Sequence, residues 1–185
     1  MQNNKRNKMV GIIVYGSLLN SAELDDHDLS PEHVVPVKIR GYKRLFNQKP
    51  SWRVGTGDHI GVLNVECESE AWINAICLYI PHEEQNVFAS RESGYIREEI
   101  HANAITCYPG FCMIEDISYY IYRGKEEKIG KNILPNHEYL DICVQGAAEW
   151  GEDFMREFFT TTHLACGTIL PEYIRIHRND LKKHL

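Results

Sequence analysis

Glu92 is the residue whose surroundings in the sequence best suit acid–base chemistry. It lies in residues 88–95, a stretch typical of the end of a short amphipathic helix, a left-handed glycine stop at Gly94 and the start of a strand at Tyr95. Glu92 follows Phe88 by four residues, so the two side chains share one apolar face of that helix. Burial there favours the neutral acid and predicts a raised pKa for Glu92, which suits a general base or acid near neutrality. The alternative is a glutamate that ends the helix in solvent.

A second candidate feature is the turn that follows the first apolar run, residues 10–15. This run predicts a strand buried on both faces, and the glycine directly after it permits a sharp turn. The N–H groups at the turn would leave the strand without partners and form an anion-binding concavity. They belong to Gly16, Ser17, Leu18 and Leu19. The alternative is a turn that only connects two elements. Ser17 is not expected to be a nucleophile, because no G-x-S-x-G motif surrounds it.

Composition predicts a single domain without a nucleic-acid or membrane partner. The chain has 185 residues, is 43% hydrophobic and carries a net charge of −6, which argues against a nucleic-acid surface. Its apolar runs are too short for a membrane span or a signal peptide, and we therefore expect a cytoplasmic protein. The expected layout is a flexible tail over residues 1–8, a single domain over 9–170 and a C-terminal extension over 171–185.

The cysteines and histidines do not predict a metal site. None of the six cysteines forms a C-x-x-C pair, and the nine histidines follow no ligand spacing. Cys107 and Cys112 flank an expected hairpin turn at residues 108–111, which would bring them close enough for a disulfide. In a cytosolic protein we expect reduced thiols instead.

The order of elements predicts an α+β fold: a small mixed, mostly antiparallel β-barrel of about six strands, closed or nearly closed, with flanking helices. A helix begins after the cap Asn136, is interrupted at Gly151 and continues as a second apolar stripe. The polar loop 49–58 contains Trp52, which is either a lid over a pocket or a contact with the core. The predicted strands are 34–46, as a strand pair or one long strand bent at Gly41, a hairpin of 61–66 and 71–80, and two arms at 95–107 and 111–123.

Short motifs then occur in a familiar order between about residue 10 and about residue 163. They are Tyr15-Gly16-Ser17-Leu18, residues 41–46, residues 91–95 and Glu138-Tyr139-Leu140. With these motifs in this order, the chain resembles the γ-glutamylcyclotransferase superfamily, which includes the ChaC-type glutathione-degrading enzymes and the AIG2-like proteins. The resemblance implies a small mixed barrel with flanking helices. The chain departs from the ChaC pattern at Leu19-Asn20, where an aromatic residue is usual, and at Ser93, where a second glycine is usual.

The resemblance also implies an enzyme that needs no cofactor or metal, because the substrate itself supplies both reacting groups. The α-amine of a γ-glutamyl amide attacks its own γ-carbonyl, which releases 5-oxoproline and an amine, amino acid or dipeptide. Glu92 is implied as the general base and acid, and the turn after the first strand as the cradle of the γ-glutamyl group. The implied site residues are catalytic Glu92 and substrate-binding Tyr15, Gly16, Ser17, Leu18, Tyr95 and Tyr139.

Other interpretations of the same residues stay open. The barrel could be inactive and serve as a binding module for a small molecule or a protein. The substrate could be glutathione, a γ-glutamyl amino acid or a γ-glutamylamine. Tyr15, Tyr95 and Tyr139 could be core aromatics. Arg44 and Arg97 could pair with a carboxylate, although pairing at the surface is expected. The expected partner is a small γ-glutamyl substrate, bound by a monomer or a homodimer.

Overall fold

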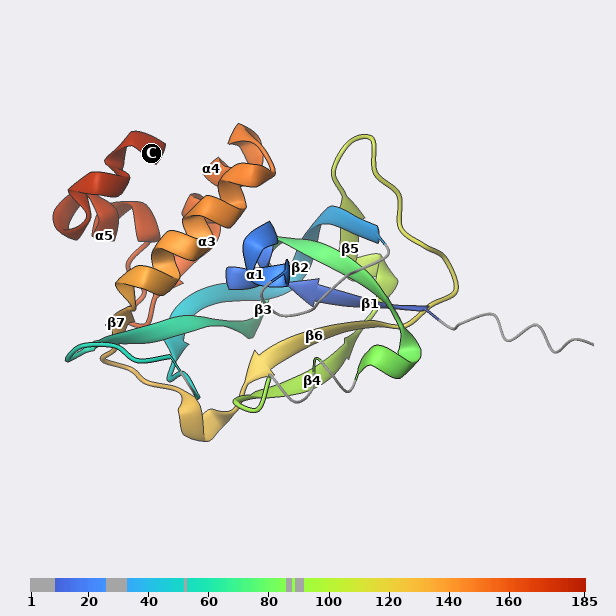
Figure 1. Cartoon of the computed structure of the whole chain (residues 1–185), viewed down its shortest axis with the longest axis horizontal. Helices are drawn as coiled ribbons and strands as arrows, with labels where there is room; N and C mark the ends of the chain where they lie inside the picture. The colour runs from blue at the N-terminus through green and yellow to red at the C-terminus, as the bar shows by residue number, and fades with distance from the viewer. Residues whose placement is uncertain (1–8, 26–32, 52, 86–87, 89–91) are drawn as a thin grey trace, which may run out of the picture.

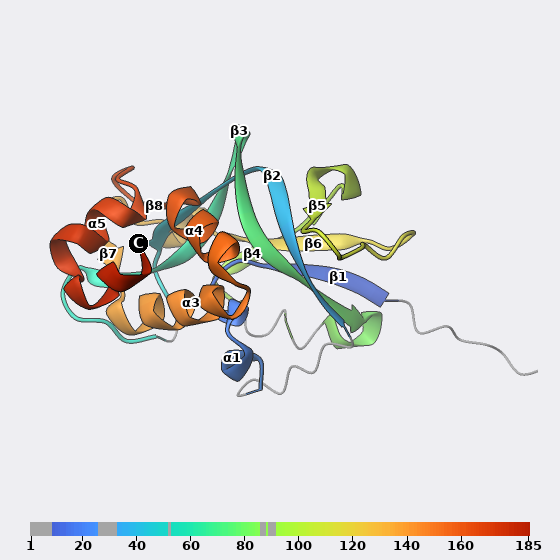
Figure 2. The ribbon, with the colours of Figure 1, turned by 90° about the horizontal axis from the view of Figure 1, so that it is seen from above.

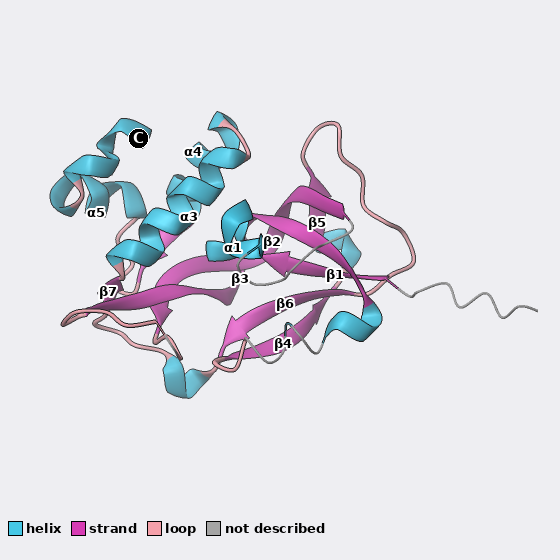
Figure 3. Ribbon diagram, in the orientation of Figure 1, coloured by secondary structure: helices cyan, strands magenta, loops and turns pink. Residues whose placement is uncertain are grey.

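The computed structural model describes residues 9–25, 33–51, 53–85, 88 and 92–185. The expected tail at 1–8, Trp52, and residues 86–87 and 89–91 of the expected helix lie outside this set. Figure 1 shows a twisted sheet with helices α3, α4 and α5 gathered at one end, and Figure 3 shows the same division by element type. The α+β class predicted from the sequence is confirmed.

The described strands form one mixed, mostly antiparallel sheet. Its central order is β4-β6-β1-β3-β2-β5, while β7 pairs with β3 and β8 pairs with β2. Within the described residues, β4 pairs only with β6 and β5 only with β2, so the sheet is open rather than closed into the expected barrel. The strands are β1 (Met9–Val14), β2 (His33–Gln48), β3 (His59–Pro81), β4 (Tyr95–Ile100), β5 (Ile105–Cys107), β6 (Tyr119–Gly124), β7 (Leu134–Pro135) and β8 (Thr162–Leu164).

Strand β1 is the centre of this sheet. It pairs antiparallel with β3 on one side and parallel with β6 on the other. Its residues from Val10 onwards are buried, as the uninterrupted apolar run predicts. The end of β1 therefore delivers the turn at Gly16 to a fixed place beside two other strands.

Strands β2 and β3 are long partners that bend together, and Figure 2 shows them side by side. The predicted bend at Gly41 is confirmed, since this glycine has φ +87° where the register shifts between Arg40 and Tyr42. The predicted hairpin at residues 67–70 is wrong, because β3 is one continuous strand of 23 residues. Residues 67–70 are polar because they form an exposed, bulged part of that strand.

The segment from Tyr95 to Arg123 also differs from its prediction. The expected long strand is broken after β4 by a 3-10 turn at Ala102–Ala104. β5 then pairs with β2, whereas β6 pairs with β1 and β4, so the turn at 109–110 does not close a hairpin. Cys107 and Cys112 are free thiols.

Helices α3 and α4 begin where the local signals at Asn136 and Gly151 predict, whereas the sequence predicts neither α1 nor α5. The side chain of Asn136 caps α3 (His137–Glu149) by accepting the N–H of Tyr139 at 3.0 Å. Gly151, with φ +97°, separates α3 from α4 (Glu152–Thr161). Within the described residues, no helix has the length and apolar character needed to cross a membrane. The other α-helices are α1 (Ser21–Asp25) and α5 (Leu170–His177), and 3-10 helices cover Ser17–Leu19, His82–Glu84, Ala102–Ala104, Glu126–Lys128 and Asn179–His184.

Helix α3 lies directly against the turn that follows β1. The indole N–H of Trp150 donates to the carbonyl of Leu19 at 3.1 Å, and the N–H of Ser21 donates to the Glu149 carboxylate at 3.1 Å. Gly146 makes the approach close, because a Cβ there would lie 2.4 Å from the backbone nitrogen of Asn20. The glycine is therefore required by packing against backbone that cannot move aside.

We predict that Gly146→Ala destabilises the protein despite the better helix propensity of alanine. The gain from propensity is about 1 kcal/mol, whereas forcing a methyl group into a filled contact typically costs about 1–3 kcal/mol. Thermal unfolding should show a lower Tm for Gly146→Ala. The matched control is Gln145→Ala, an exposed position in the same helix, which should leave Tm nearly unchanged. A Tm of Gly146→Ala equal to or above that of the control would contradict the contact.

Candidate functional site

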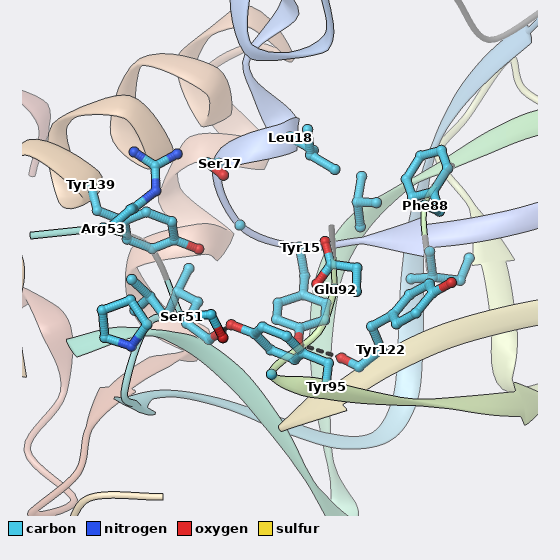
Figure 4. A pocket seen from close by; sticks show the side chains of 17 residues that line it. Tyr15, Ser17, Leu18, Ser51, Arg53, Phe88, Glu92, Tyr95, Tyr122 and Tyr139 are labelled. Carbon is cyan, nitrogen blue, oxygen red and sulfur yellow. Dashed lines mark hydrogen bonds between the residues drawn. The ribbon is translucent and has the colours of Figure 1, made fainter. Parts of the chain in front are cut away.

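One pocket brings together all seven residues expected from the sequence. It lies where the end of β1 meets the loop after β2, the turn before β4, strand β6 and helix α3 (Figure 4). The predicted residues that line it are Tyr15, Gly16, Ser17, Leu18, Glu92, Tyr95 and Tyr139. Their convergence supports a single site, while the role of each remains a prediction.

Glu92 enters the pocket from the turn before β4. Its N–H donates to the carbonyl of Phe88 at 3.1 Å, and its own carbonyl accepts the N–H of Tyr95 at 2.8 Å. The first bond joins two residues four positions apart, the spacing at which the sequence predicts that Phe88 and Glu92 share one face. Phe88 is buried and Glu92 is half-buried, so this carboxylate is not at an ordinary solvent-exposed helix end. The raised pKa of Glu92 stays a prediction.

Gly94 ends this turn for a different reason than predicted. Its φ does not lie in the left-handed region. A Cβ at this position would instead lie 2.9 Å from the hydroxyl of Ser51 and 3.1 Å from the amide nitrogen of Gln48. The Gln48 amide also donates to the carbonyl of Gly94 at 2.8 Å. A side chain at position 94 would therefore displace the Ser51 hydroxyl or the Gln48 amide from its place beside the turn.

The turn after β1 supplies main-chain donors on the other wall. Residues Ser17–Leu19 form a 3-10 turn, in which the N–H of Leu19 donates to the carbonyl of Gly16 at 3.0 Å. The expectation that Leu19 offers a free donor is therefore wrong. Ser17 and Leu18 open the turn, so their N–H groups have no acceptor within it. These two groups are the donors that can meet an anion in the pocket.

The tyrosines of the pocket divide into two kinds. The hydroxyl of Tyr15 donates to the carbonyl of Tyr122 at 2.5 Å, and that of Tyr95 donates to the carbonyl of Leu63 at 2.8 Å. These bonds hold the two rings in place as walls of the pocket. This agrees with the alternative that Tyr15 and Tyr95 are core aromatics. Burial, above all, raises the pKa of both phenols, and the nearby Glu92 carboxylate raises it further, so both stay protonated.

Tyr139 reaches the turn from helix α3. Its ring is buried, and burial raises its pKa well above the usual value. The hydroxyl lies over Gly16, where an added Cβ would approach it to 2.4 Å. Tyr139 therefore needs a glycine at position 16, and the pair fixes the distance between α3 and the turn.

Arg53 is a pocket residue that the sequence did not reveal. It belongs to the loop 49–58, and its guanidinium lies 5.0 Å from the ring centre of Tyr139 while pairing with Glu23 at 2.7 Å. Its position depends on Glu23 and Tyr139, which are distant in sequence. The polar composition of the loop gave no signal for this contact. Arg53 places a positive charge at the Tyr139 end of the pocket.

Arg44 is a buried cation behind the pocket, not the surface residue expected. It is fully buried and donates to the carbonyls of Tyr15 at 3.3 Å, Asn74 at 2.9 Å and Phe158 at 3.2 Å. Side-chain oxygens of Asn74, Thr161 and Thr162 accept its remaining bonds. Burial lowers the pKa of Arg44 to about 9. The contact with Tyr15 holds the peptide that leads into the turn.

The remaining charged groups near β4 have local partners. Arg97 donates to the amide oxygen of Gln85 at 2.6 Å, and Glu98 pairs with Arg123 at 2.6 Å. Across the described part of the chain, no three His, Cys, Asp or Glu side chains gather in a way that could hold a metal ion.

We predict that Gly16→Ala and Tyr139→Phe are strongly non-additive. Gly16→Ala alone forces the new methyl group against the Tyr139 hydroxyl and should lower Tm by several degrees, corresponding to about 1–3 kcal/mol. Adding Tyr139→Phe removes that oxygen, after which the nearest ring carbon lies at 3.6 Å, an ordinary contact. The double variant should therefore recover most of the lost stability. Additive losses in thermal unfolding would show that the two residues do not touch.

Comparison with solved structures identifies the fold. A structure described as a gamma-glutamyl cyclotransferase aligns with a TM-score of 0.62 at 14% identity, over 82% of this chain and 86% of that one. YkqA from Bacillus subtilis aligns with a TM-score of 0.57 at 16% identity, over 84% of this chain and 56% of that one. An uncharacterised protein from Homo sapiens gives 0.56 at 14% identity, over 82% and 86%. No protein-family model and no curated protein matches the sequence. The chain has the γ-glutamylcyclotransferase-like fold that its motifs predict.

Proposed function

We propose that the protein is a γ-glutamylcyclotransferase, which cleaves a γ-glutamyl amide by cyclising it to 5-oxoproline. The observation that carries this proposal is the pocket itself. A half-buried carboxylate, Glu92, and the turn from Gly16 to Leu18 line the same cavity in a γ-glutamylcyclotransferase-like fold. Acid–base groups and oxyanion donors together are what an intramolecular acyl transfer requires.

Glu92 acts first as a base in this scheme. It takes a proton from the α-ammonium of the substrate, and the free amine then attacks the γ-carbonyl carbon to form a five-membered ring. The new carbon–nitrogen bond places negative charge on the carbonyl oxygen. Both reacting groups belong to one substrate molecule. Holding the substrate in a folded conformation, with its amine close to its own carbonyl, therefore supplies much of the rate enhancement.

The turn stabilises the charge that develops on the substrate. The N–H groups of Ser17 and Leu18 point from a rigid main chain, so they need no reorganisation as the oxyanion forms. Collapse of the intermediate breaks the bond to the leaving nitrogen. Glu92 returns its proton to that nitrogen and then takes the second proton from the positively charged ring nitrogen, so that 5-oxoproline, with a neutral ring amide, and a free amine are released.

The walls of the pocket position the substrate. Arg53 and the turn offer positive charge and N–H donors to the α-carboxylate of the γ-glutamyl group. Tyr15 and Tyr95, whose hydroxyls are held by main-chain carbonyls, enclose the reacting centre beside Glu92. Tyr139 closes the pocket above Gly16.

We predict that Glu92→Gln abolishes most of the cyclisation while the protein stays folded. Loss of a general base typically lowers the rate about 10²- to 10⁴-fold. The measurement is release of 5-oxoproline from a panel of γ-glutamyl compounds that includes glutathione, a γ-glutamyl amino acid and a γ-glutamylamine. Binding of 5-oxoproline, followed by calorimetry, should persist in the variant.

The matched control is Glu99→Gln, which removes the same charge from an exposed position on β4. It should retain wild-type turnover. Full turnover by Glu92→Gln would remove Glu92 from the mechanism. Binding of γ-glutamyl compounds by the wild type without release of 5-oxoproline from any of them would favour a binding module over an enzyme.

A further inference from the structure

Two buried amide side chains join the strands that follow the acid to the opposite part of the sheet. Glu92 lies just before β4, whose first residue, Tyr95, pairs with Gly124, the last residue of β6. This end of the β4–β6 pair contacts Gln48 at the end of β2 and Asn64 in β3. The exposed fractions of Gln48 and Asn64 are 0% and 1%. Both amides therefore serve contacts inside the protein.

The two amides hold the main chain at this end of β4 and β6. The side-chain nitrogen of Gln48 donates to the carbonyl of Gly94 at 2.8 Å. The side-chain oxygen of Asn64 accepts the N–H of Gly124 at 2.6 Å. In the sheet order of the described residues, neither β2 nor β3 is a neighbour of β4 or β6. The two bonds therefore fix a distance that strand pairing alone does not set.

The main chain around Gln48 is itself held on both sides. The N–H of Lys49 donates to the carbonyl of Lys128 at 2.8 Å, and the N–H of Gly130 donates to the carbonyl of Asn47 at 2.8 Å. The amide of Gln48 therefore extends from a fixed strand end. Its hydrogen bond determines where the turn before β4 lies.

This turn connects the Gln48 amide to the proposed base. The carbonyl of Glu92 accepts the N–H of Tyr95 at 2.8 Å, so Gly94 lies inside a tight turn that begins at Glu92. A shift of the Gly94 peptide therefore moves the carboxylate relative to the N–H donors of the turn after β1. A displacement of about 1 Å can cost about 10²-fold in rate. Gln48 lies outside the pocket lining, so its route to the reaction is this turn.

Stability does not explain the Gln48 amide. Within the described part of the chain, its side-chain oxygen is buried and has no hydrogen-bond partner. A Cβ at Gly124 would lie 2.1 Å from this oxygen, so the glycine gives the amide its space. One hydrogen bond stabilises a protein modestly, whereas a buried polar atom without a partner destabilises it by a similar amount. The two effects offset each other, and the position of the turn is what the amide contributes.

We propose that Gln48, supported by Asn64 on the neighbouring strand, is a positioning residue that holds Glu92 at the place proton transfer requires. This assignment rests on the proposed cyclotransferase function. It extends the machinery of the site beyond the residues that line the pocket. The consequence is selective, because a displaced base slows the reaction while the turn after β1 still binds the ligand.

The test is Gln48→Met, which keeps a similar side-chain length and volume but removes the amide. The carbonyl of Gly94 retains the N–H of Lys125, which donates to it at 3.0 Å, so the change leaves it bonded. We expect kcat for a γ-glutamyl amide to fall about 10- to 100-fold. The dissociation constant of 5-oxoproline, measured by calorimetry, should change less than about 2-fold. Tm should shift by less than about 4 °C.

The matched control is Gln145→Met, the same substitution at an exposed position of α3, which should leave all three quantities unchanged. An unchanged kcat in Gln48→Met would overturn the assignment, as would a loss of 5-oxoproline affinity as large as the loss in kcat. A larger fall in Tm would also overturn it, because Gln48 would then be required for the fold. Absence of wild-type turnover on every γ-glutamyl amide would instead refute the proposed function on which the assignment rests.

Discussion

The position of the main chain at residues 15–18 is the constraint on which the site depends. From behind, the buried Arg44 requires carbonyl acceptors, because a cation without partners would be very costly in the interior. Tyr15, Asn74 and Phe158 supply them and so draw the end of β1, strand β3 and helix α4 together. In front, the absence of side chains at Gly16 and Gly146 lets helix α3 approach the turn. The turn is thus held on two sides by contacts that leave it little freedom.

The acid on the opposite wall is positioned by the same sheet. β6 lies beside β1, and β4 lies beside β6, so the residues just before β4 come close to the end of β1. The Gln48 amide ties the carbonyl of Gly94 to β2 and fixes the turn that presents Glu92. Catalytic groups on rigid elements hold their geometry better than groups on long loops, which is what oxyanion stabilisation and proton transfer both require.

Local signals in the sequence predicted the parts of the fold that depend on neighbouring residues. The cap at Asn136, the break at Gly151, the bend at Gly41 and the four-residue spacing of Phe88 and Glu92 all have short-range causes. The predictions that proved wrong depend instead on contacts between segments that are distant in sequence. The polar stretch 67–70 is an exposed bulge on a strand held by β2, and Arg44 is buried only because segments distant in sequence supply its acceptors. The contacts of Arg53 with Glu23 and Tyr139 likewise join segments that are distant in sequence, which the sequence alone does not reveal.

The most direct test of the account is a crystal structure of the Glu92→Gln protein with an uncleaved γ-glutamyl amide bound. We expect the α-amine of the ligand beside the side chain of residue 92, and its γ-carbonyl oxygen within hydrogen-bond distance of the N–H groups of Ser17 and Leu18. The ligand should be folded so that its amine faces its own carbonyl carbon. A ligand bound in an extended conformation, or bound elsewhere with this pocket holding only solvent, would contradict the claim that the acid and the turn together promote cyclisation.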